Sequence, residues 1–382
     1  MKLIHLSDLH FGKKLHEHSL LEDQKFICDE ILNIIKEEKP DAVLIAGDVY
    51  DKSLPSVEAS SLASDFFTEL ANLKIKTLVI SGNHDSAERM NCFSDLIRLS
   101  GIHIAHPYDG STQKIVLEDE FGPVNIYLLP FIKPVDVKHF NQEAAENITD
   151  YDSAVRFAIE GMNLDLLERN VLVAHQFVTG ASTSDSETFS VGGLDNVGAD
   201  AFSAFNYVAL GHIHKPQALS STLRYCGTPL KYSFSEAKHN KSVTVINLDK
   251  NGKVQIEEIA LRPLHDLVEI EGKYSELMNN DFYKDFPQNE RGELKDYYHI
   301  TLTDEDDIID AARKLRSIYK NLLLLSYQGR EVETLAGLDE DALEKKSELE
   351  LCMDFFEDQN GRPIYDEEKA LLIEVIESLR RE

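Results

Sequence analysis

The sequence predicts an α/β fold with two sheets packed face to face and helices on both outer sides, a four-layer sandwich. In the first half of the chain, short apolar runs of strand length alternate with longer stretches of helical periodicity. This alternation indicates right-handed crossovers and a parallel sheet. From about residue 102 onward, strand-like and hairpin-like segments dominate instead, which favours a second sheet.

The first half is expected to contain a strand–helix repeat. The expected strands are Leu3–Leu6, Ala42–Ala46 and Thr77–Ser81, and the expected helices are Leu20–Glu38, Val57–Leu73 and Ala87–Leu99. The first of these helices should end at Pro40, because proline cannot continue a helix.

Strands prevail in the next part of the chain, with one helix among them. The expected helix is Asp152–Gly161, and the expected strands are His103–Ala105, Lys114–Leu117, Val124–Phe131, Asn170–Ala174, Tyr207–Leu210, Arg224–Tyr225, Ser242–Asn247 and Val254–Leu261. The last three are expected to be antiparallel strands of the second sheet.

A domain boundary is expected at Arg262-Pro263. Residues 1–262 would form the main domain, and residues 263–336 a small α+β module. The elements expected in the module are the strands His265–Glu271, Tyr297–Thr303 and Leu322–Tyr327 and the helix Asp306–Tyr319. Residues 337–382 would form two acidic helices, the second with an apolar stripe from Leu371 to Leu379.

The composition is that of a folded protein. The chain has 382 residues, of which 42% are apolar and 28% charged, enough for a large core and a smaller module. No apolar run approaches the roughly 18 residues of a membrane-spanning helix, and the N-terminal strand leaves no room for a signal peptide. The four cysteines occur singly, as is typical of a reducing compartment. We therefore expect a cytoplasmic protein without membrane contact.

Residues that can bind metal directly follow five of the apolar runs. They are Asp8 with His10, Asp48, Asn83, His175, and His212 with His214. Since the carboxyl ends of parallel strands meet at one edge of a sheet, we expect these side chains at the same edge of one parallel sheet. Aspartate, asparagine and imidazole, without a thiolate, suit two divalent cations of the manganese, iron or zinc kind. Two such ions roughly 3.5–4 Å apart would hold the attacking and leaving oxygens of a phosphoester displacement.

Taken singly, each of these residues has an ordinary explanation. An aspartate after a strand is more often a cap or turn residue, and a lone histidine means little in a chain with 14 histidines. Five strand ends that carry ligand-type residues in order are difficult to explain in that way. The pattern therefore predicts a chain that cleaves phosphoesters.

The segments around these residues resemble the signature of the calcineurin-like metallophosphoesterases. The segments are HLSDLHFG, IAGDVYD, SGNHDS, VAHQFV and YVALGHIHKPQ, followed by YCGTPLKYSFSE. Within that family they are most similar to the SbcD-type nuclease subunits of double-strand-break repair. The resemblance is close over about residues 1–240 and extends to residues 265–382 only in layout.

The resemblance implies a role for each residue of the site. The first ion would be held by Asp8, His10 and His214, the second by Asn83, His175 and His212, with Asp48 bridging the two. His84 would be the catalytic histidine, and a histidine beside the ions can also protonate the leaving 3′ oxygen. As an acid its loss should spare the metal, whereas as a ligand its loss should abolish metal binding. Asp85 would orient His84 or a ligand, or else be a plain turn carboxylate.

Partners also follow from the resemblance. Residues 263–336 would be a capping domain that shapes DNA access, and the helices Val57–Leu73 and Ala87–Leu99 could form a homodimer or simply cover the sheet. The terminal helices would dock on an SbcC-type ATPase, in a heterotetramer with two copies of each subunit. Five basic residues near the motifs could meet DNA phosphates or be ordinary surface charges, namely Lys13, Lys14, Arg89, Lys215 and Lys231.

The charge balance limits the affinity for DNA. The net charge is −29, whereas contacts of basic residues to phosphate normally supply much of nucleic-acid binding. Part of the acid is concentrated in residues 331–382, with 17 acidic and 6 basic residues, and two bound cations would reverse the local field. We expect the chain alone to bind DNA weakly, with a partner supplying basic surface.

These observations predict the subunit of a manganese-dependent DNA nuclease that acts in DNA repair, recombination and replication. It would have 3′→5′ exonuclease activity on duplex DNA and endonuclease activity near ends or hairpins. A partner would gate it with ATP, since nothing in the chain resembles a glycine-rich nucleotide-binding loop. Two alternatives stay open: a small-molecule phosphodiesterase or phosphatase on the same fold, and a scaffold for DNA and the ATPase with a vestigial site.

Overall fold

Two six-stranded sheets form the body of the molecule. The computed structural model describes residues 1–142, 145–187, 196–306, 308–328 and 369. The first sheet has the strand order β14-β13-β1-β4-β5-β6, and the second has the order β11-β12-β10-β9-β8-β7.

The first sheet is parallel at its centre. Its parallel strands are β1 (Lys2–Leu6), β4 (Ala42–Ala46), β5 (Lys76–Ile80) and β6 (Ile102–Ile104), and its antiparallel strands are β13 (Ser242–Leu248) and β14 (Val254–Ala260). The strand β4 is buried along its whole length. Continuous apolar runs such as this one suit a parallel sheet that is covered on both faces.

The second sheet has the same construction. Its parallel strands are β8 (Gly122–Leu129), β9 (Arg169–His175), β10 (Tyr207–Gly211) and β12 (Leu223–Tyr225), and its antiparallel edge strands are β7 (Gln113–Asp119) and β11 (Gln217–Ala218). Strand β9 is fully buried from end to end. Both sheets therefore place the carboxyl ends of central parallel strands at an edge where loops can form a site.

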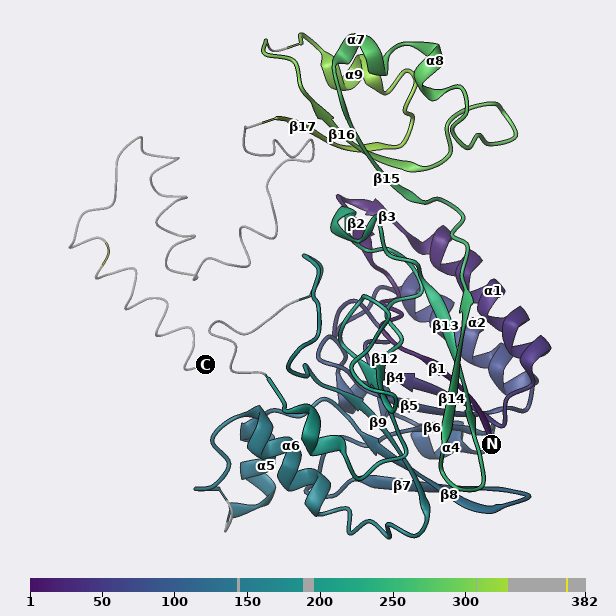
Figure 1. The fold of residues 1–382 in the computed structure, drawn as a ribbon, viewed down its shortest axis with the longest axis vertical. Helices are drawn as coiled ribbons and strands as arrows, with labels where there is room; N and C mark the ends of the chain where they lie inside the picture. Colours follow the sequence, from purple (N-terminus) through teal and green to yellow (C-terminus); the bar gives the residue numbers. More distant parts are fainter. Residues whose placement is uncertain (143–144, 188–195, 307, 329–368, 370–382) are drawn as a thin grey trace.

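Helices cover the outer face of each sheet (Figure 1). Helices α1 (Leu21–Glu38) and α2 (Val57–Asn72) pack on the first sheet, and α5 (Pro134–Phe140) and α6 (Tyr151–Glu160) pack on the second. A separate apolar layer fills the space between the sheets, with side chains such as Leu44 and Leu78 from one sheet and Ile126 and Val173 from the other. The predicted four-layer sandwich is confirmed.

Two expectations about the strands were wrong. Strands β13 and β14 belong to the first sheet rather than the second, because β13 pairs antiparallel with β1. Strand β12 runs parallel to β10 rather than antiparallel. Alternation of apolar and polar residues identifies a strand, but its neighbour is set by pairing between segments about 240 residues apart, such as Leu3 and Ile246.

The helix expected over Ala87–Leu99 is broken in two. Helix α3 (Ala87–Met90) and helix α4 (Ser94–Arg98) are separated by Phe93, whose φ of 63° is left-handed. A left-handed residue cannot continue a right-handed helix. Helix α5 was not expected, although Pro134 at its first turn is a start signal. Among the helices that the structure describes, none is both long and apolar enough to cross a membrane.

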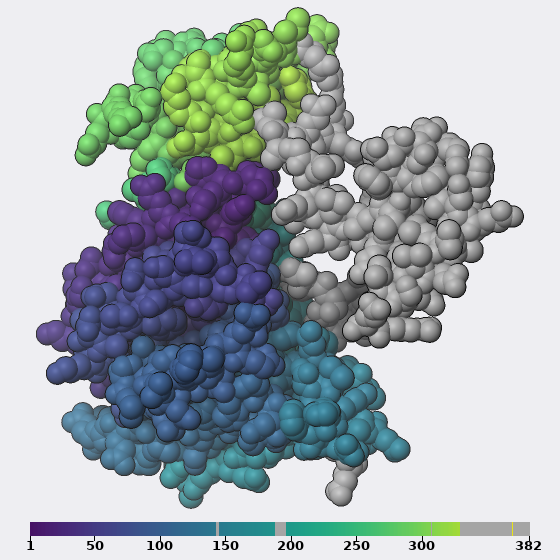
Figure 2. Space-filling view, turned by 180° about the vertical axis from the view of Figure 1, so that it is seen from behind, coloured from purple at the N-terminus to yellow at the C-terminus, as the bar shows by residue number. Residues whose placement is uncertain are grey.

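Residues 263–328 form a smaller unit, which we call the C-terminal module. Its strands β15 (Leu267–Gly272), β16 (Tyr297–Leu302) and β17 (Leu322–Tyr327) are parallel, and its helices are α7 (Tyr274–Leu277), α8 (Asn280–Tyr283) and α9 (Ala311–Leu315). Helix α9 is shorter than expected, because Asp310 before it is left-handed with φ 57°. The module lies at one end of the molecule, beside dark-purple residues from early in the chain (Figure 2), which in Figure 1 include the strands β2 (Lys14–Leu15) and β3 (His18–Ser19). The expected helices of residues 337–382 lie outside the described residues.

A buried carboxyl group fastens the module to the main body. Asp23 of α1 is 2% exposed, and its Oδ1 lies 2.9 Å from Nδ1 of His265. The hydroxyl of Tyr297 donates to Asp23 Oδ2 at 2.8 Å and lies 3.1 Å from Nε2 of His18. A buried carboxyl group requires such donors, since leaving it without them costs free energy. The position of the module therefore depends on this network.

We predict that Tyr297→Phe loosens the module. The substitution leaves Oδ2 of Asp23 without its donor, while Oδ1 keeps His265, and it should lower the opening free energy of β16 amides by about 1–3 kcal/mol, measured by hydrogen exchange. Tyr298→Phe is the matched control, because the buried Tyr298 hydroxyl has no hydrogen-bond partner within the described part of the chain. That control should cost little. Equal losses in both variants would contradict the fastening role of Asp23.

Candidate metal centre

The two sheets contact each other where parallel strands of both sheets end. Nδ1 of His175, the last residue of β9, donates to the carbonyl oxygen of Ala46, the last residue of β4, at 2.7 Å. A Cβ atom at Gly211 would collide with that same carbonyl, and one at Gly47 would collide with the His175 ring. Glycine is therefore required at both positions. The expectation that the ligands share one sheet was wrong, since the edges of two packed sheets meet here.

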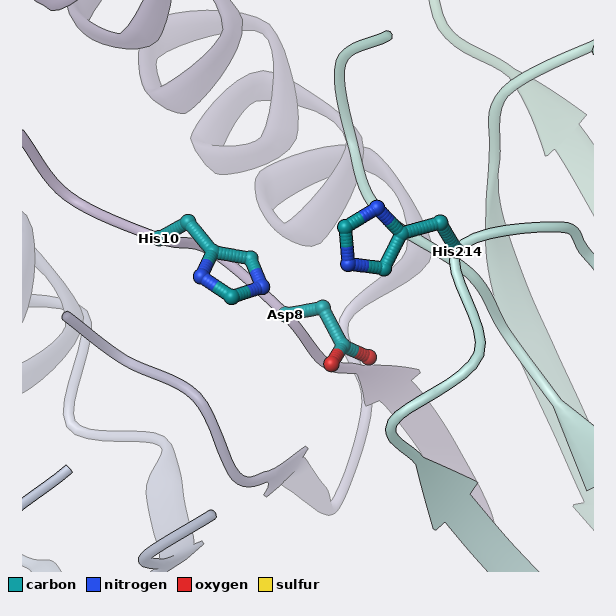
Figure 3. A group of neighbouring side chains, drawn as sticks. All are labelled: Asp8, His10 and His214. Atoms are coloured by element: carbon teal, nitrogen blue, oxygen red, sulfur yellow. The ribbon is translucent and has the colours of Figure 1, made fainter. Parts of the chain in front are cut away.

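Three predicted ligands lie together on one side of this meeting point. Asp8 and His10 follow β1, and His214 follows β10. One ligand atom from each side chain lies within 4.8 Å of the others, and all three residues are buried. Figure 3 shows one ring nitrogen of each histidine directed toward the other two side chains. The structure therefore brings together the three residues expected to hold the first ion.

The other three ligands expected to share an ion are grouped around an amide oxygen. Oδ1 of Asn83 lies 3.0 Å from Nε2 of His175 and 3.0 Å from Nδ1 of His212. Asn83 follows β5, so this group combines a loop of the first sheet with two loops of the second. A neutral oxygen and two imidazoles are suitable ligands for a divalent transition metal.

Asp48 lies between the two groups. Its Oδ2 is 3.7 Å from Nε2 of His10 in the first group and 3.3 Å from Nε2 of His175 in the second. Its Oδ1 accepts a hydrogen bond from the backbone N–H of His84 at 2.9 Å. A Cβ at Gly82 would collide with this carboxylate, so glycine makes room for it. This is the position that a bridging carboxylate needs.

Several of these residues have an uncommon backbone conformation. Asp8, His10, Asp48 and His212 have φ values of 52°, 45°, 48° and 100°. Left-handed conformations in residues other than glycine cost about 1–3 kcal/mol each and are concentrated at functional sites. The amide N–H of His212 also donates to Oδ1 of Asp8 at 3.0 Å, which holds these two loops together. These strained backbone conformations are therefore stabilised by contacts within the site.

The donor set fits divalent cations. Both ring nitrogens of His10 are buried and have no hydrogen-bond partner among the described residues. An unsatisfied buried nitrogen costs about 1–3 kcal/mol, so a buried imidazole of this kind needs another partner. Nδ1 of His175 is already used by the Ala46 carbonyl, which leaves Nε2 available for a metal ion, an arrangement that is usual for metal-binding histidines.

Burial and mutual charge shift the pKa values in the centre. Burial raises the pKa of Asp8 to about 6. Burial alone would also raise the pKa of Asp48, but the neighbouring His175 keeps it well below its usual range. Burial opposes protonation of His175, yet the Asp48 carboxylate raises its pKa to about 9. Burial, with the charge of His175, lowers the pKa of His212 to about 3.

His84 lies beside the two groups. Its Nδ1 donates to the carbonyl oxygen of Asp51 at 2.9 Å, which leaves Nε2 for another contact. Its ring meets the His10 ring edge to face, with centroids 4.9 Å apart. The carboxylate of Asp85 accepts hydrogen bonds from backbone N–H groups of Val49, Tyr50 and Gly82 at 2.9–3.1 Å. Of the expected roles for Asp85, these contacts favour orienting a ligand, because they hold the loop that carries Asp48.

The predicted basic residues have different surroundings. Lys13 pairs with Asp51 at 2.9 Å near the centre, and Lys14 pairs with Glu17 at the surface. The ammonium group of Lys231 lies 2.7 Å from Asp266 of the C-terminal module and donates to the Ala237 carbonyl. Lys231 therefore forms a contact between the main body and the module, and a contact of Lys231 with DNA phosphates stays a prediction. Arg89 and Lys215 are exposed.

Other residues around the centre were missed in the sequence. Gln24 of α1 donates to the His10 carbonyl at 2.6 Å and accepts from the Gly12 N–H at 2.9 Å, so it shapes the loop after β1. The sequence did contain an indication of this role, because Gln24 is a polar residue on the apolar stripe of an amphipathic helix. Asp51, 3.8 Å from Nδ1 of His10, and Glu236 were also missed. Both lie within the signature segments, close to residues that had been assigned.

Comparisons with known proteins agree with this geometry. A family model described as calcineurin-like phosphoesterase matches residues 1–216. A second model, described as the type 5 capsule protein repressor C-terminal domain, matches residues 263–360. The SbcD subunit of the nuclease SbcCD from Staphylococcus epidermidis is 34% identical over 334 residues, which cover 85% of each chain. The chain belongs to the SbcD family of calcineurin-like phosphoesterases.

Solved structures similar to this SbcD family member include phosphoesterases. A dimetal phosphatase from Danio rerio is 14% identical, with a TM-score of 0.37, and the match covers 69% of this chain and 99% of that one. An archaeal phosphodiesterase is also 14% identical, with a TM-score of 0.31, and the match covers 68% and 100% of the two chains.

We predict that metal binding releases protons. His175, with a pKa of about 9, is protonated at pH 7 before metal binds and must lose that proton to become a ligand. The affinity for Mn²⁺ should therefore rise with pH up to about 9, with a steeper rise below about 6, where Asp8 also holds a proton. Calorimetry at pH 7 in two buffers of different ionisation enthalpy counts the protons. No release at pH 7 would contradict the charge state given for His175.

Proposed function

We propose that this chain is the nuclease subunit of an SbcCD-type complex and hydrolyses phosphodiester bonds of DNA with two divalent cations. The observation that carries the proposal is the position of Asp48 between two groups of ligands, 3.7 Å from His10 and 3.3 Å from His175. Membership of the SbcD family supports DNA as the substrate. We further propose Mn²⁺ as the preferred ion, with exonuclease and endonuclease activity at DNA ends.

The chemistry is divided between the ions and His84. Divalent cations at this site would supply Lewis acidity toward the phosphoryl oxygens and make water acidic enough to attack at neutral pH. The Asp51 carbonyl holds Nδ1–H of His84, so Nε2 is the atom that can give a proton to the leaving 3′ oxygen. The hydrogen bond from the backbone N–H of His84 to the Asp48 carboxylate holds His84 next to the residue that we propose bridges the two ions.

The C-terminal module supports a large substrate. It is fastened to α1 through Asp23, whose neighbour Gln24 holds the His10 carbonyl, so the module and the centre share one helix. We propose that the module caps the main domain, with the boundary near Arg262-Pro263, and shapes the access of DNA. A small-molecule phosphodiesterase would not need such a module. The complete ligand set speaks against a vestigial site.

We propose two protein partners. The first is an SbcC-type ATPase in a complex with two copies of each subunit, docked on residues 337–382, which apart from Lys369 lie outside the described residues. The second is another copy of this chain, which would cover apolar side chains around α2 and α4. These side chains are Leu54, Val57, Phe93, Leu96 and Leu99, each at least 65% exposed. A cytoplasmic location is proposed as well, since Cys28, Cys92 and Cys226 are free thiols.

We predict that two substitutions separate metal binding from turnover. Asp48→Ala removes the proposed bridge and should abolish both metal binding and activity. His84→Gln should keep the metal and lower turnover by about 10²–10⁴-fold. The matched control is His139→Gln, an exposed histidine outside the centre, which should behave like the unchanged chain. The assay uses end-labelled duplex DNA with Mn²⁺ or a chelator, with and without the ATPase, alongside Mn²⁺ binding measured directly.

The outcomes distinguish the alternatives. Mn²⁺-dependent shortening of the DNA that is lost in both site variants is the expected result. Turnover of a chromogenic phosphodiester with no digestion of DNA, even with the ATPase, would assign the chain to the small-molecule phosphodiesterases. Equal loss of metal in Asp48→Ala and His84→Gln would contradict the division of roles.

A further inference from the structure

A buried ion pair lies directly behind one of the proposed metal ligands. Glu236 ends the short 3₁₀ helix η3 (Phe234–Glu236), and its side chain is completely buried. Its Oε1 lies 3.0 Å from Nδ1 of His214, and its Oε2 is held by the ammonium group of Lys241. The hydroxyl of Ser186 donates to Oε1 and lies 2.9 Å from the same ring nitrogen. Both oxygens of the carboxylate are therefore used.

This arrangement determines which nitrogen of His214 can bind metal. A carboxylate only accepts hydrogen bonds, so the nitrogen that faces Glu236 carries the proton. The other ring nitrogen is the one directed toward Asp8 and His10 in Figure 3, and its lone pair is free. A carboxylate that accepts a hydrogen bond from one imidazole nitrogen both orients a metal-binding histidine and raises its basicity.

The second charge of the pair is held equally firmly. Lys241 is 6% exposed, and its Nζ donates to the His214 carbonyl at 2.8 Å and to Thr228 Oγ1 at 2.6 Å. It therefore fixes the backbone of His214 while Glu236 fixes the ring. Burying an ion pair contributes little to stability, because desolvation offsets much of the attraction. This ion pair contacts both the ring and the backbone carbonyl of His214, so its role is better explained as positioning His214.

The segment that carries Glu236 is anchored to the C-terminal module. The Phe234 ring lies 5.3 Å from the His299 ring of β16, measured between centroids. Lys231 at the start of the segment pairs with Asp266 of the module. The segment Lys231–Lys241 thus contacts the module on one side and His214 on the other.

We propose that Glu236, supported by Lys241, is a positioning residue for the first metal ion and acts through the ring of His214. The inference rests on the proposed two-ion function, which it deepens by assigning a residue to one of the two ions. It follows that Glu236 should affect the ion of Asp8, His10 and His214 and leave the ion of Asn83, His175 and His212 unchanged. A residue that merely stabilised the fold would affect both ions alike.

The test is a titration with Mn²⁺ alone, followed by electron paramagnetic resonance, which reports the number of bound ions and their affinities. We expect the unchanged chain to bind two ions. Glu236→Ala should weaken one of them about ten- to hundred-fold and leave the other unchanged. Glu236→Gln, whose amide oxygen can still accept from His214, should lose less. In a His212→Ala background, where the second ion is weakened, Glu236→Ala should remove the remaining tight binding.

Two further variants keep the test decisive. If Glu236→Ala fails to fold because Lys241 is left unpaired, Glu236→Ala with Lys241→Met removes both charges and should show the same loss at one ion. The matched control is Asp296→Asn, which changes a carboxyl group that is 3% exposed and lies in the C-terminal module, and it should bind two ions normally. The inference would be overturned if Glu236→Ala, alone or with Lys241→Met, bound both ions with unchanged affinity, or if the affinities of both ions fell equally. Failure of the unchanged chain to bind two ions would overturn the proposed function itself.

Discussion

The hydrogen bond from His175 to the Ala46 carbonyl joins the two sheets at the proposed metal centre. The sheets approach so closely there that only glycine fits at positions 47 and 211. Because central parallel strands of both sheets end at this place, loops from both deliver ligands into one volume. The apolar layer between the sheets stabilises this approach, so the position of every ligand depends on how the sheets pack.

The strand ends and their ligands could be predicted because they are local patterns. An apolar run followed by Asp48 or His175 needs no knowledge of the rest of the chain. Sheet membership could not be predicted in this way, since the pairing of β13 with β1 joins the two ends of the main body. Glu236 was missed for a related reason: it lies on a 3₁₀ segment without periodicity, and only the fold brings it to His214.

Burial makes the metal-free centre costly. Asp8, Asp48 and His175 are almost fully excluded from water, and the His10 nitrogens have no partner among the described residues. Left-handed backbone at Asp8 and His10 adds strain. A ligand that binds only the folded state stabilises it by mass action. Cations at this centre would therefore compensate the buried carboxylates, give the His10 nitrogens a partner and hold the strained loops. They would also offset part of the −29 net charge at the place where a phosphate must approach.

We infer that loops of the two sheets form a single centre for two ions, with Asp48 between them. Crystals of the chain soaked in Mn²⁺ test it directly through anomalous scattering. We expect two peaks, one in contact with Asp8, His10 and His214 and the other with Asn83, His175 and His212, with Asp48 touching both. A single peak, or two peaks of which only one contacts Asp48, would contradict it.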